Sequence, residues 1–347
     1  MSKPRVIVNP HGRSMADLFS DADRQRLHER FDAVWAQDGP MPTEAFLAEL
    51  PKADAVIFST WSWGKDALRN AAGPGLKAIL ETGGGHGHED LDYDYCFERG
   101  IRVGSCAWAF ADGVAEMALG LTLAATRGIA LSDRQFRDGT ETYLQKGNEE
   151  NYLLFGKTVG FVGCGGLSRP LQRMLEPFGV KVLGYDPFMD ASVLRGRGIE
   201  PASLEAIFET ADVVYVLAVP TPENRGLVSR SLMERLREHA VLCVVSRAYL
   251  VDFEAMTELV LAGRFRVATD VFPGEPLASE HPLRQAKHAV LSPHRAGGVP
   301  EALQTIGKWA IEDLASIFAD REPMRYQYAT PAIRQLVRAS EAAEAAG

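Results

Sequence analysis

The sequence predicts an α/β protein, with parallel sheets covered by crossover helices. Short runs rich in β-branched residues alternate along the chain with amphipathic segments of helix length, which is the pattern of that class. The chain has 347 residues, and because a domain usually holds roughly 100–200 residues, we expect two domains or one large one. Hydrophobic residues make up 46% and charged residues 24%, so the chain has enough apolar side chains for real cores.

The first third of the chain is expected to form one α/β unit. Short β-branched runs predict strands at residues 5–8, 33–35, 55–59, 78–81 and 102–104. Amphipathic segments between them predict helices at residues 21–30, 43–50, 65–72 and 91–99.

A nearly all-apolar helix is expected next, at residues 111–127. Asp112 is its expected N-cap, and Glu116 is the one charged interruption that follows it. Such a helix must be buried on most sides, so we expect it between domains or between subunits. The polar stretch at residues 133–150 has no clear period and predicts a helix end followed by a loop.

A second α/β series begins near Lys157. Strands are predicted at residues 158–162, 181–185, 213–218, 241–245, 266–269 and 289–291. Helices are predicted at residues 168–178, 204–210, 231–237 and 253–262. A last helix at 301–318 follows Gly297 and Gly298, and the low-complexity tail at 341–347 is expected to fray.

Charge and cysteine content exclude several classes of protein. The formal net charge of −9 argues against nucleic acid as a partner, although a local cluster of Arg and His can still bind a small anion. The four cysteines form neither a CxxC pair nor a zinc-like set, which indicates free thiols in a reducing compartment. With no signal-like start and no apolar run near ~18 residues, we expect a soluble cytoplasmic protein that is not bound to a membrane.

In the middle of the chain an apolar strand runs into a glycine turn that opens a helix. A Rossmann turn needs glycine for the bend, for close approach of the backbone to a pyrophosphate, and for helix–strand packing. Gly163 and Gly165 fill the first two places, and Ser168 stands in the third. The helix N-terminus offers unpaired N–H groups to phosphates, so Gly166 and Leu167 belong to the predicted site. A plain strand-to-helix turn is the alternative.

An acidic residue follows the next strand at the spacing that a dinucleotide site requires. Asp186 lies about 20 residues beyond the turn, where a carboxylate hydrogen-bonds the adenosine ribose hydroxyls and disfavours a 2′-phosphate. NAD is therefore preferred to NADP. Arg195 and Arg197 come soon afterwards and would weaken that preference if they faced the ribose; a solvated helix end is the alternative that we favour.

Further motifs follow one another at residues 156–165, 219–228, 245–248, 269–277 and 291–298. Together they resemble the D-isomer-specific 2-hydroxyacid dehydrogenase family, which includes phosphoglycerate, glyoxylate/hydroxypyruvate and D-lactate dehydrogenases. The resemblance covers nearly all of residues 75–310, whereas the first 70 residues match only in their strand–helix pattern. It implies a Rossmann NAD-binding domain at 107–298, and a flavodoxin-like substrate domain made of residues 1–106 and 299–347.

The resemblance also implies a catalytic set. Reducing a 2-keto acid requires a cation for the carboxylate, an acid that delivers a proton and a nicotinamide that delivers hydride. Arg247 matches the family's substrate-binding arginine, His294 its general acid/base, and Glu275 the carboxylate that fixes the tautomer of the imidazole. A surface arginine and a loop histidine are the alternatives.

Other contacts are implied in the same way. The expected NAD contacts include Val219, Pro220, Ser246, Arg247, Asp270 and His294. Asp270 corresponds to the residue that contacts the nicotinamide amide, and its alternative role is to cap a helix or a loop. The expected substrate contacts include Arg247, His294 and a glycine loop of Gly83, Gly84, Gly85 and His86, whose successive N–H groups would make an anion nest. A flexible connection is the alternative for the loop, and no metal is expected.

The chain departs from the family pattern in a few places. Ala248 and Tyr249 follow the arginine where glycine and a small residue are usual, and Arg295 follows the histidine. Trp61, Trp63 and Trp108 suggest an aromatic wall, although core packing is the interpretation that we favour.

The implied activity is reversible reduction of a 2-keto acid to a D-2-hydroxy acid by NADH, in a homodimer built around the coenzyme domains. The alternatives are a non-enzymatic NAD-sensing scaffold like the family's corepressors, and a formate-dehydrogenase-like enzyme. The second is disfavoured because that branch carries glutamine where Glu275 stands. The sequence does not indicate the substrate's side chain.

Overall fold

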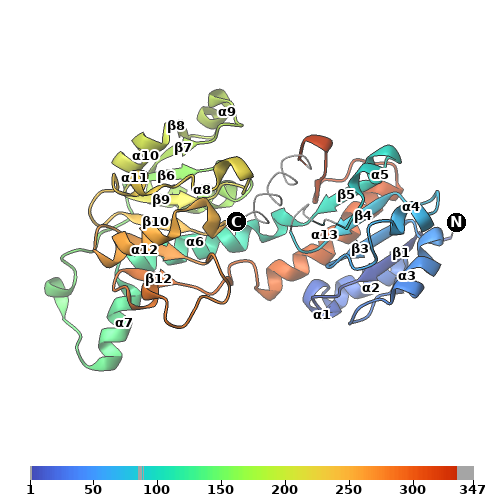
Figure 1. Ribbon diagram of the computed structural model, residues 1–347, viewed down its shortest axis with the longest axis horizontal. Coiled ribbons are helices and arrows are strands. Elements are labelled where there is room, and N and C mark those ends of the chain that lie inside the picture. The colour runs from blue at the N-terminus through green and yellow to red at the C-terminus, as the bar shows by residue number, and fades with distance from the viewer. Residues whose placement is uncertain (1, 85–87, 89, 334–347) are drawn as a thin grey trace. The chain divides into compact units, whose positions relative to one another are not determined.

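The computed structural model describes residues 2–84, 88 and 90–333, and divides the chain into two compact units (Figure 1). The first unit comprises Met1–Phe110 and Gly298–Gly347, and the second comprises Ala111–Gly297. The first unit is thus discontinuous in sequence, with the chain leaving it after Phe110 and returning at Gly298.

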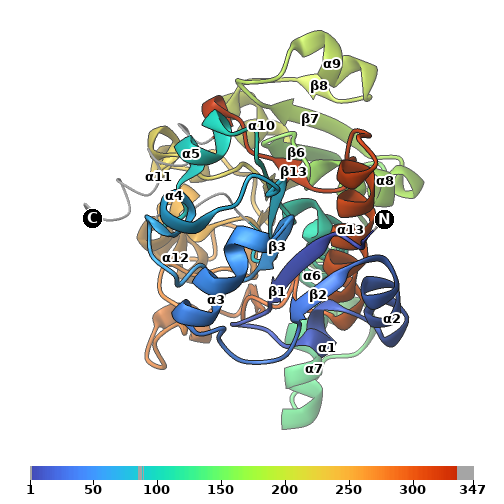
Figure 2. The same cartoon turned by 90° about the vertical axis from the view of Figure 1, so that its right-hand side faces the viewer.

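The first unit is built on a six-stranded sheet with the order β13-β5-β4-β3-β1-β2. All neighbouring strands pair in parallel except β13, which pairs antiparallel to β5. The parallel part has the flavodoxin-like order, in which the chain starts in the middle of the sheet; β3, β1 and β2 lie side by side in Figure 2. The strands are β1 (Arg5–Asn9), β2 (Asp32–Trp35), β3 (Ala55–Phe58), β4 (Ala78–Glu81), β5 (Arg102–Ser105) and β13 (Gln327–Tyr328).

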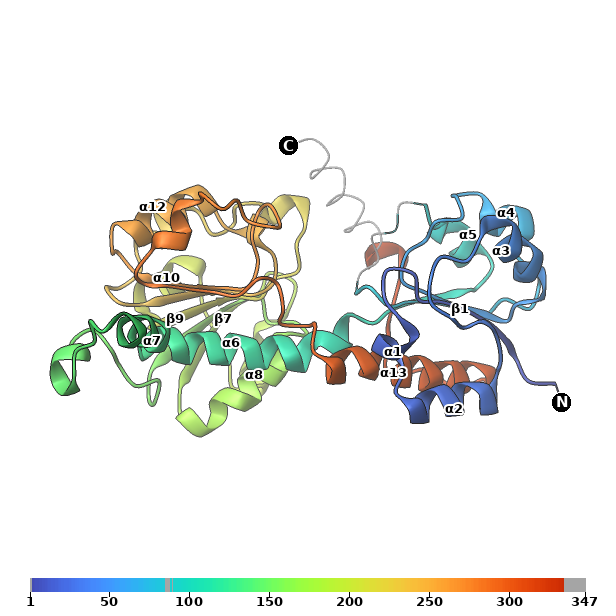
Figure 3. The ribbon, with the colours of Figure 1, turned by 90° about the horizontal axis from the view of Figure 1, so that it is seen from below.

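Helices cover both faces of this sheet, so its central strands are fully buried. Figure 3 shows α1, α2 and α13 on one face and α3, α4 and α5 on the other. Alternate residues of β1 serve the two cores, with Val6 and Val8 packed toward α13 and Ile7 toward the opposite layer. The helices are α1 (Met15–Leu18), α2 (Asp21–Arg30), α3 (Thr43–Glu49), α4 (Ala67–Ala71), α5 (Tyr93–Glu98) and α13 (Pro300–Phe318), with the 3-10 turns η1 (Leu50–Lys52) and η2 (Ala107–Phe110).

The second unit holds a seven-stranded, wholly parallel sheet with the order β12-β11-β10-β9-β6-β7-β8. This is the doubly wound order, in which the strand order reverses between β6 and β9 and ligands bind outside the carboxyl ends of the strands. The strands are β6 (Thr158–Val162), β7 (Lys181–Tyr185), β8 (Glu200–Pro201), β9 (Val213–Val216), β10 (Val241–Val244), β11 (Arg266–Thr269) and β12 (Ala289–Leu291). The helices are α6 (Ala111–Thr126), α7 (Ile129–Asp138), α8 (Ser168–Leu175), α9 (Ala191–Gly196), α10 (Leu204–Thr210), α11 (Arg230–Met233) and α12 (Phe253–Leu261). The 3-10 turns are η3 (Leu144–Gly147), η4 (Glu176–Phe178), η5 (Pro222–Asn224), η6 (Ala248–Leu250) and η7 (Pro282–Gln285).

The apolar helix α6 lies inside the second unit, packed on β10, β11, β12 and α8. Its expected N-cap is wrong: α6 begins directly after η2, so Asp112 is an exposed residue of the first helical turn. Among the described residues, Ala107–Thr126 is the one helix that is long and apolar enough to cross a membrane. A core helix passes the same test, and packing against the sheet accounts for this composition.

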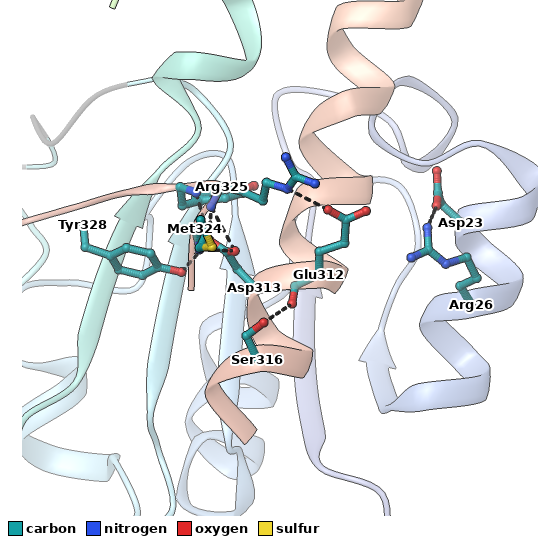
Figure 4. Close-up of polar contacts among 9 residues, drawn as sticks. Asp23, Arg26, Glu312, Asp313, Ser316, Met324, Arg325 and Tyr328 are labelled. Carbon is teal, nitrogen blue, oxygen red and sulfur yellow. Dashed lines mark hydrogen bonds and ion pairs between the residues drawn. The ribbon is translucent and has the colours of Figure 1, made fainter. Parts of the chain in front are cut away.

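A buried carboxylate holds the end of the described chain against the first unit (Figure 4). Asp313, on α13, is 1% exposed. Its oxygens accept the backbone N–H groups of Met324, Arg325 and Tyr326 at 2.8–3.2 Å and the hydroxyl of Tyr328 at 2.9 Å. Burial and the charge of Asp313 raise the pKa of Tyr328. These bonds explain why a short strand, β13, forms here.

Asp313→Asn is expected to lower the free energy of unfolding by about 3 kcal/mol, because an amide nitrogen would face donors that need an acceptor. Urea unfolding followed by circular dichroism measures this loss. Glu312→Gln is the matched control: Glu312 is the preceding residue of α13 and pairs with Arg325 at 2.9 Å near the surface, so its loss should cost less than about 1 kcal/mol. Equal stability of the two variants would contradict the role given to Asp313.

All four cysteines are buried free thiols. Burial raises the pKa of Cys96, Cys164 and Cys243 to about 12, and raises that of Cys106 well above its usual value. Because the pKa values are raised, the thiols stay protonated at every pH below that range. The reactive thiolate is therefore scarce in the folded protein.

We expect the native protein at pH 8 to resist a thiol-specific reagent, since a thiol with a pKa of about 12 is ionised in roughly one molecule in 10⁴ at that pH. Urea-unfolded protein should label at all four cysteines. Intact-mass spectrometry after a short exposure gives the count for each state. Rapid labelling of the native protein would show that at least one thiol is accessible.

Candidate active site

The glycine turn after β6 has the backbone that a dinucleotide site requires. Gly163 has φ +93°, and a Cβ on it would lie 2.5 Å from the backbone of Ala218, so only glycine fits there. A Cβ on Gly165 would meet nothing within 4 Å. The space beside Gly165 is therefore open to a ligand, as the second place of the motif demands.

The helix that follows the turn has an N-terminus without a side-chain cap. Gly166 and Leu167 lead into α8, and no side chain of Leu167, the N-cap residue, accepts a hydrogen bond from the helix. Its first N–H groups can therefore donate to an anion. Ser168 is fully buried and donates from Oγ to the carbonyl oxygen of Gly165 at 2.8 Å.

Asp186 lies where the sequence predicts it, directly after β7. Its Oδ2 accepts the N–H of Cys164 at 2.9 Å, and its Oδ1 accepts the N–H of Phe188 at 3.0 Å. The carboxylate therefore braces the glycine turn, and each of its oxygens accepts one backbone N–H group.

The favoured interpretation of Arg197, a solvated helix end, is wrong, whereas Arg195 is exposed as expected. Arg197 is half-buried, and its guanidinium donates to the carbonyl oxygen of Cys164 at 2.6 Å and to Oγ of Ser168 at 3.0 Å. These two acceptors of the glycine turn bind the guanidinium and so explain why the side chain does not extend into solvent.

Loops after β9 and β10 are tied together by the tyrosine that departs from the family pattern. The hydroxyl of Tyr249 donates to the carbonyl oxygen of Thr221 and lies 2.9 Å from Oδ1 of Asn224. Asn224 in turn donates to the carbonyl oxygen of Val219 at 2.9 Å. This leaves the Val219 side chain, beside Pro220, 72% exposed at the carboxyl edge of the sheet.

The loop after β10 carries Ser246 and Arg247. Ser246 is buried, and its Oγ has no hydrogen-bond partner among the described residues. A buried hydroxyl of this kind calls for a partner that the chain itself does not supply, which fits a bound cofactor. Arg247 is exposed, donates to the carbonyl oxygen of Ser246 at 2.9 Å, and has no carboxylate partner in the described part of the chain.

His294 and Glu275 form a close pair. Nδ1 of His294 lies 2.6 Å from Oε2 of Glu275, while Oε1 of that carboxylate accepts the N–H of Phe272 at 3.0 Å. Because Glu275 engages Nδ1, Nε2 is the ring nitrogen left to exchange a proton with a substrate. His294 has φ +51°, so its backbone is held in the left-handed region by its surroundings.

Asp270, at the end of β11, supplies part of that support. Its carboxylate is 1% exposed and accepts the N–H groups of Arg295 and Ala296, each at 2.9 Å, while its carbonyl oxygen accepts the N–H of His294 at 2.8 Å. The structure thus gives Asp270 the loop-capping role that was the alternative in the sequence. Each of its oxygens keeps a second lone pair.

The glycine loop of the first unit differs from the expected anion nest. Glu81, the last residue of β4, is 2% exposed and turns its carboxylate back onto the loop. It accepts the N–H of Gly83, and that of Gly84 at 3.0 Å. The first two amides of the expected nest therefore hold an internal carboxylate in this structure, and the assignment of Gly83 and Gly84 to a substrate carboxylate stays a prediction. Gly85 and His86 lie outside the described residues.

Two of the three tryptophans named above pack in the core, which is the interpretation that we favoured. Trp61 and Trp63 are each 5% exposed, and Trp63 stacks on Phe46 with ring centroids 3.7 Å apart. Trp108 is exposed.

The second unit matches a known family along most of its length. Residues 119–296 match the family described as "D-isomer specific 2-hydroxyacid dehydrogenase, NAD binding domain". This chain belongs to that family. The α/β class and the NAD cofactor predicted from the sequence are thereby confirmed.

Relatives of this chain cover both units. A glyoxylate reductase of Thermofilum pendens is 30% identical over 333 residues, covering 93% of this chain and 94% of the relative. A D-3-phosphoglycerate dehydrogenase of Mycobacterium tuberculosis is 30% identical over 308 residues, covering 88% of this chain and 55% of the relative. The chain thus spans about half the length of such phosphoglycerate dehydrogenases. The crystal structure of a phosphoglycerate oxidoreductase from Rhizobium etli is 32% identical, with a TM-score of 0.84 over 96% of this chain and 100% of that one.

Proposed function

We propose that this protein interconverts a D-2-hydroxy acid and a 2-keto acid by hydride transfer with NAD(H). The observation that carries the proposal is the pair of His294 and Glu275, 2.6 Å apart at the carboxyl edge of the NAD-binding sheet. Arg247 follows β10, a neighbour of β11 in that sheet, and its charge is not neutralised by a described carboxylate. The residues that we propose as proton donor and carboxylate-binding cation thus lie at the edge at which doubly wound sheets bind ligands.

Each residue has a distinct part in the reaction. Arg247 binds the substrate carboxylate through its planar fork. The hydride for the carbonyl carbon would come from NADH when it is bound at the glycine turn. Protonated His294 gives its Nε2 proton to the carbonyl oxygen, so that C=O becomes CH–OH, and Glu275 stabilises and orients the imidazole throughout. In the oxidative direction neutral His294 takes the hydroxyl proton.

The test is an assay of purified protein with NADH and a panel of 2-keto acids, followed by the loss of NADH absorbance. We expect turnover of at least one acid, because the residues proposed as proton donor and as carboxylate-binding cation lie in neighbouring regions of one sheet edge. NADH binding without turnover of any acid would favour the corepressor-like scaffold. Reduction of NAD by formate, and no reaction with 2-keto acids, would favour the formate-dehydrogenase-like alternative.

We also propose that NAD is preferred to NADP. Asp186 braces the turn with its carboxylate, and Nη1 and Nη2 of Arg197 donate to the turn and to Gln172. The ribose pocket is therefore expected to present negative charge to a 2′-phosphate. Replacing NADH by NADPH in the assay should lower kcat/KM.

A homodimer in the cytoplasm completes the proposal. Helix α7 has no buried residue, yet it carries Ile129 and Phe136, which are 55% and 65% exposed. Apolar side chains gathered on an exposed helix favour an interface. The buried free thiols support a reducing compartment. Light scattering on the purified protein should give twice the mass of the chain, and a monomer would contradict the dimer.

A further inference from the structure

The backbone of one residue in the glycine turn, Cys164, is hydrogen-bonded on both sides to charged side chains. The N–H of Cys164 donates to Oδ2 of Asp186 at 2.9 Å, and the carbonyl oxygen of the same residue accepts Nη1 of Arg197 at 2.6 Å. Asp186 follows β7 and Arg197 follows α9, so two separate segments fix the turn between Gly163 and Gly165.

Ser168, which stands in the third glycine place of the motif, is hydrogen-bonded to the same network. Oγ of Ser168 donates to the carbonyl oxygen of Gly165 at 2.8 Å and accepts Nη2 of Arg197 at 3.0 Å. A glycine at this place could make neither bond. The substitution therefore exchanges close helix–strand packing for a hydrogen-bonded link from Arg197 to the turn.

Arg197 is itself held in place from α8. Its Nη2 donates to Oε1 of Gln172 at 3.3 Å, and the side-chain amide of Gln172 donates back to the carbonyl oxygen of Arg197. Burial, together with the nearby charge of Arg169, lowers the pKa of Arg197 from its usual value. Half-burying a cation is costly unless its N–H groups are satisfied, and here Nη1 and Nη2 both donate to the turn or to α8.

We propose that Arg197 is a positioning residue for the coenzyme, acting through Ser168 and Cys164 to hold the glycine turn in the shape that receives the pyrophosphate. The inference rests on the NAD-binding role of the second unit. A turn that is already ordered loses less conformational entropy when the ligand binds. The backbone of this turn would present its N–H groups to the phosphates, so its order enters the affinity for NAD(H) directly.

The proposal predicts a coupled effect on coenzyme binding. Arg197→Ala should raise the Kd for NADH about tenfold, because the charge-assisted bonds that hold the turn are lost. Arg197→Lys should recover part of that loss, since an ammonium cannot reproduce the fork that reaches Cys164 and Ser168 together. Ser168→Ala should raise the Kd several-fold, and adding it to Arg197→Ala should raise it little further, because both variants break one network.

The experiment is a titration of each purified full-length variant with NADH, followed by quenching of tryptophan fluorescence, together with steady-state kinetics. Arg195→Ala is the matched control, because Arg195 is an exposed arginine of α9 close to Arg197 in sequence. We expect it to leave the Kd unchanged. A positioning role also predicts that KM for NADH rises in Arg197→Ala, while kcat at saturating NADH and KM for the 2-keto acid change by less than about twofold.

Three outcomes would overturn the inference. One is an NADH Kd in Arg197→Ala equal to that of the wild type, which would leave the proposed function standing. Another is additive effects of Arg197→Ala and Ser168→Ala on the Kd. The third is wild-type protein that does not bind NADH, which would overturn the proposed function as well. Thermal unfolding of the variants without coenzyme shows whether a variant is less stable in general. A variant that unfolds at the wild-type temperature but binds NADH more weakly has lost NADH affinity specifically.

Discussion

His294→Asn is expected to lower kcat for 2-keto-acid reduction by about 10³-fold, the usual worth of a positioned acid–base group. Asparagine is the informative replacement because His294 has φ +51°, which asparagine tolerates better than alanine does. The affinity for NADH should stay within about twofold of the wild type, since the glycine turn is untouched. Stopped assays with a sensitive product readout measure kcat, and NADH titration measures the affinity.

A second histidine provides the control for this variant. His239 also has a positive φ, of 65°, and its Nε2 lies 3.8 Å from Glu238 at the surface. His239→Asn should leave kcat unchanged, because it makes the same replacement in a similar backbone away from the carboxyl edge of the sheet. If His294→Asn retained wild-type turnover, or if both variants lost turnover equally, the catalytic assignment would be wrong.

Arg247→Ala is expected to raise KM for the 2-keto acid about 100-fold, because a bidentate ion pair with the substrate carboxylate is lost. The Kd for NADH should change little. Arg247→Lys should recover only part of the loss, since lysine keeps the charge and not the planar fork. Steady-state kinetics at saturating NADH give KM for the 2-keto acid in both variants, and NADH titration gives the Kd.

The outcome that contradicts this role for Arg247 is a KM unchanged in the alanine variant. Arg247 donates only to the carbonyl oxygen of Ser246 among the described residues, so its replacement should not unsettle the fold. Thermal unfolding checks that expectation independently.

The sequence predicted the central strands well because they are buried on both faces. The inner strands at 158–162, 181–185 and 266–269 have the predicted bounds, and those that begin at 213 and 241 end one or two residues earlier than predicted. A strand covered by helices on both sides is a continuous apolar run. The edge strand at 289–291 also has the predicted bounds. The short strand β13 was missed because its pairing depends on Asp313, whose hydrogen bonds join segments that no local pattern relates. Helix α11 is shorter than predicted, and it ends at Met233.

The candidate site, too, could be predicted only in part from the sequence. Motif order led to His294, Glu275 and Arg247, but the 2.6 Å contact between the first two needed the structure. The roles of Glu81 and Arg197 were not predicted, because each depends on backbone groups brought near by folding. One signal was present for Glu81: an acidic residue ends an apolar strand directly before glycines.

The central claim is hydride transfer to a 2-keto acid with D-stereochemistry. Chiral chromatography of the product formed from the best 2-keto acid of the panel, with NADH consumption followed in the same sample, tests it most directly. We expect one equivalent of the D-2-hydroxy acid for each NADH oxidised. An L or racemic product, or NADH oxidation without a hydroxy acid, would contradict it.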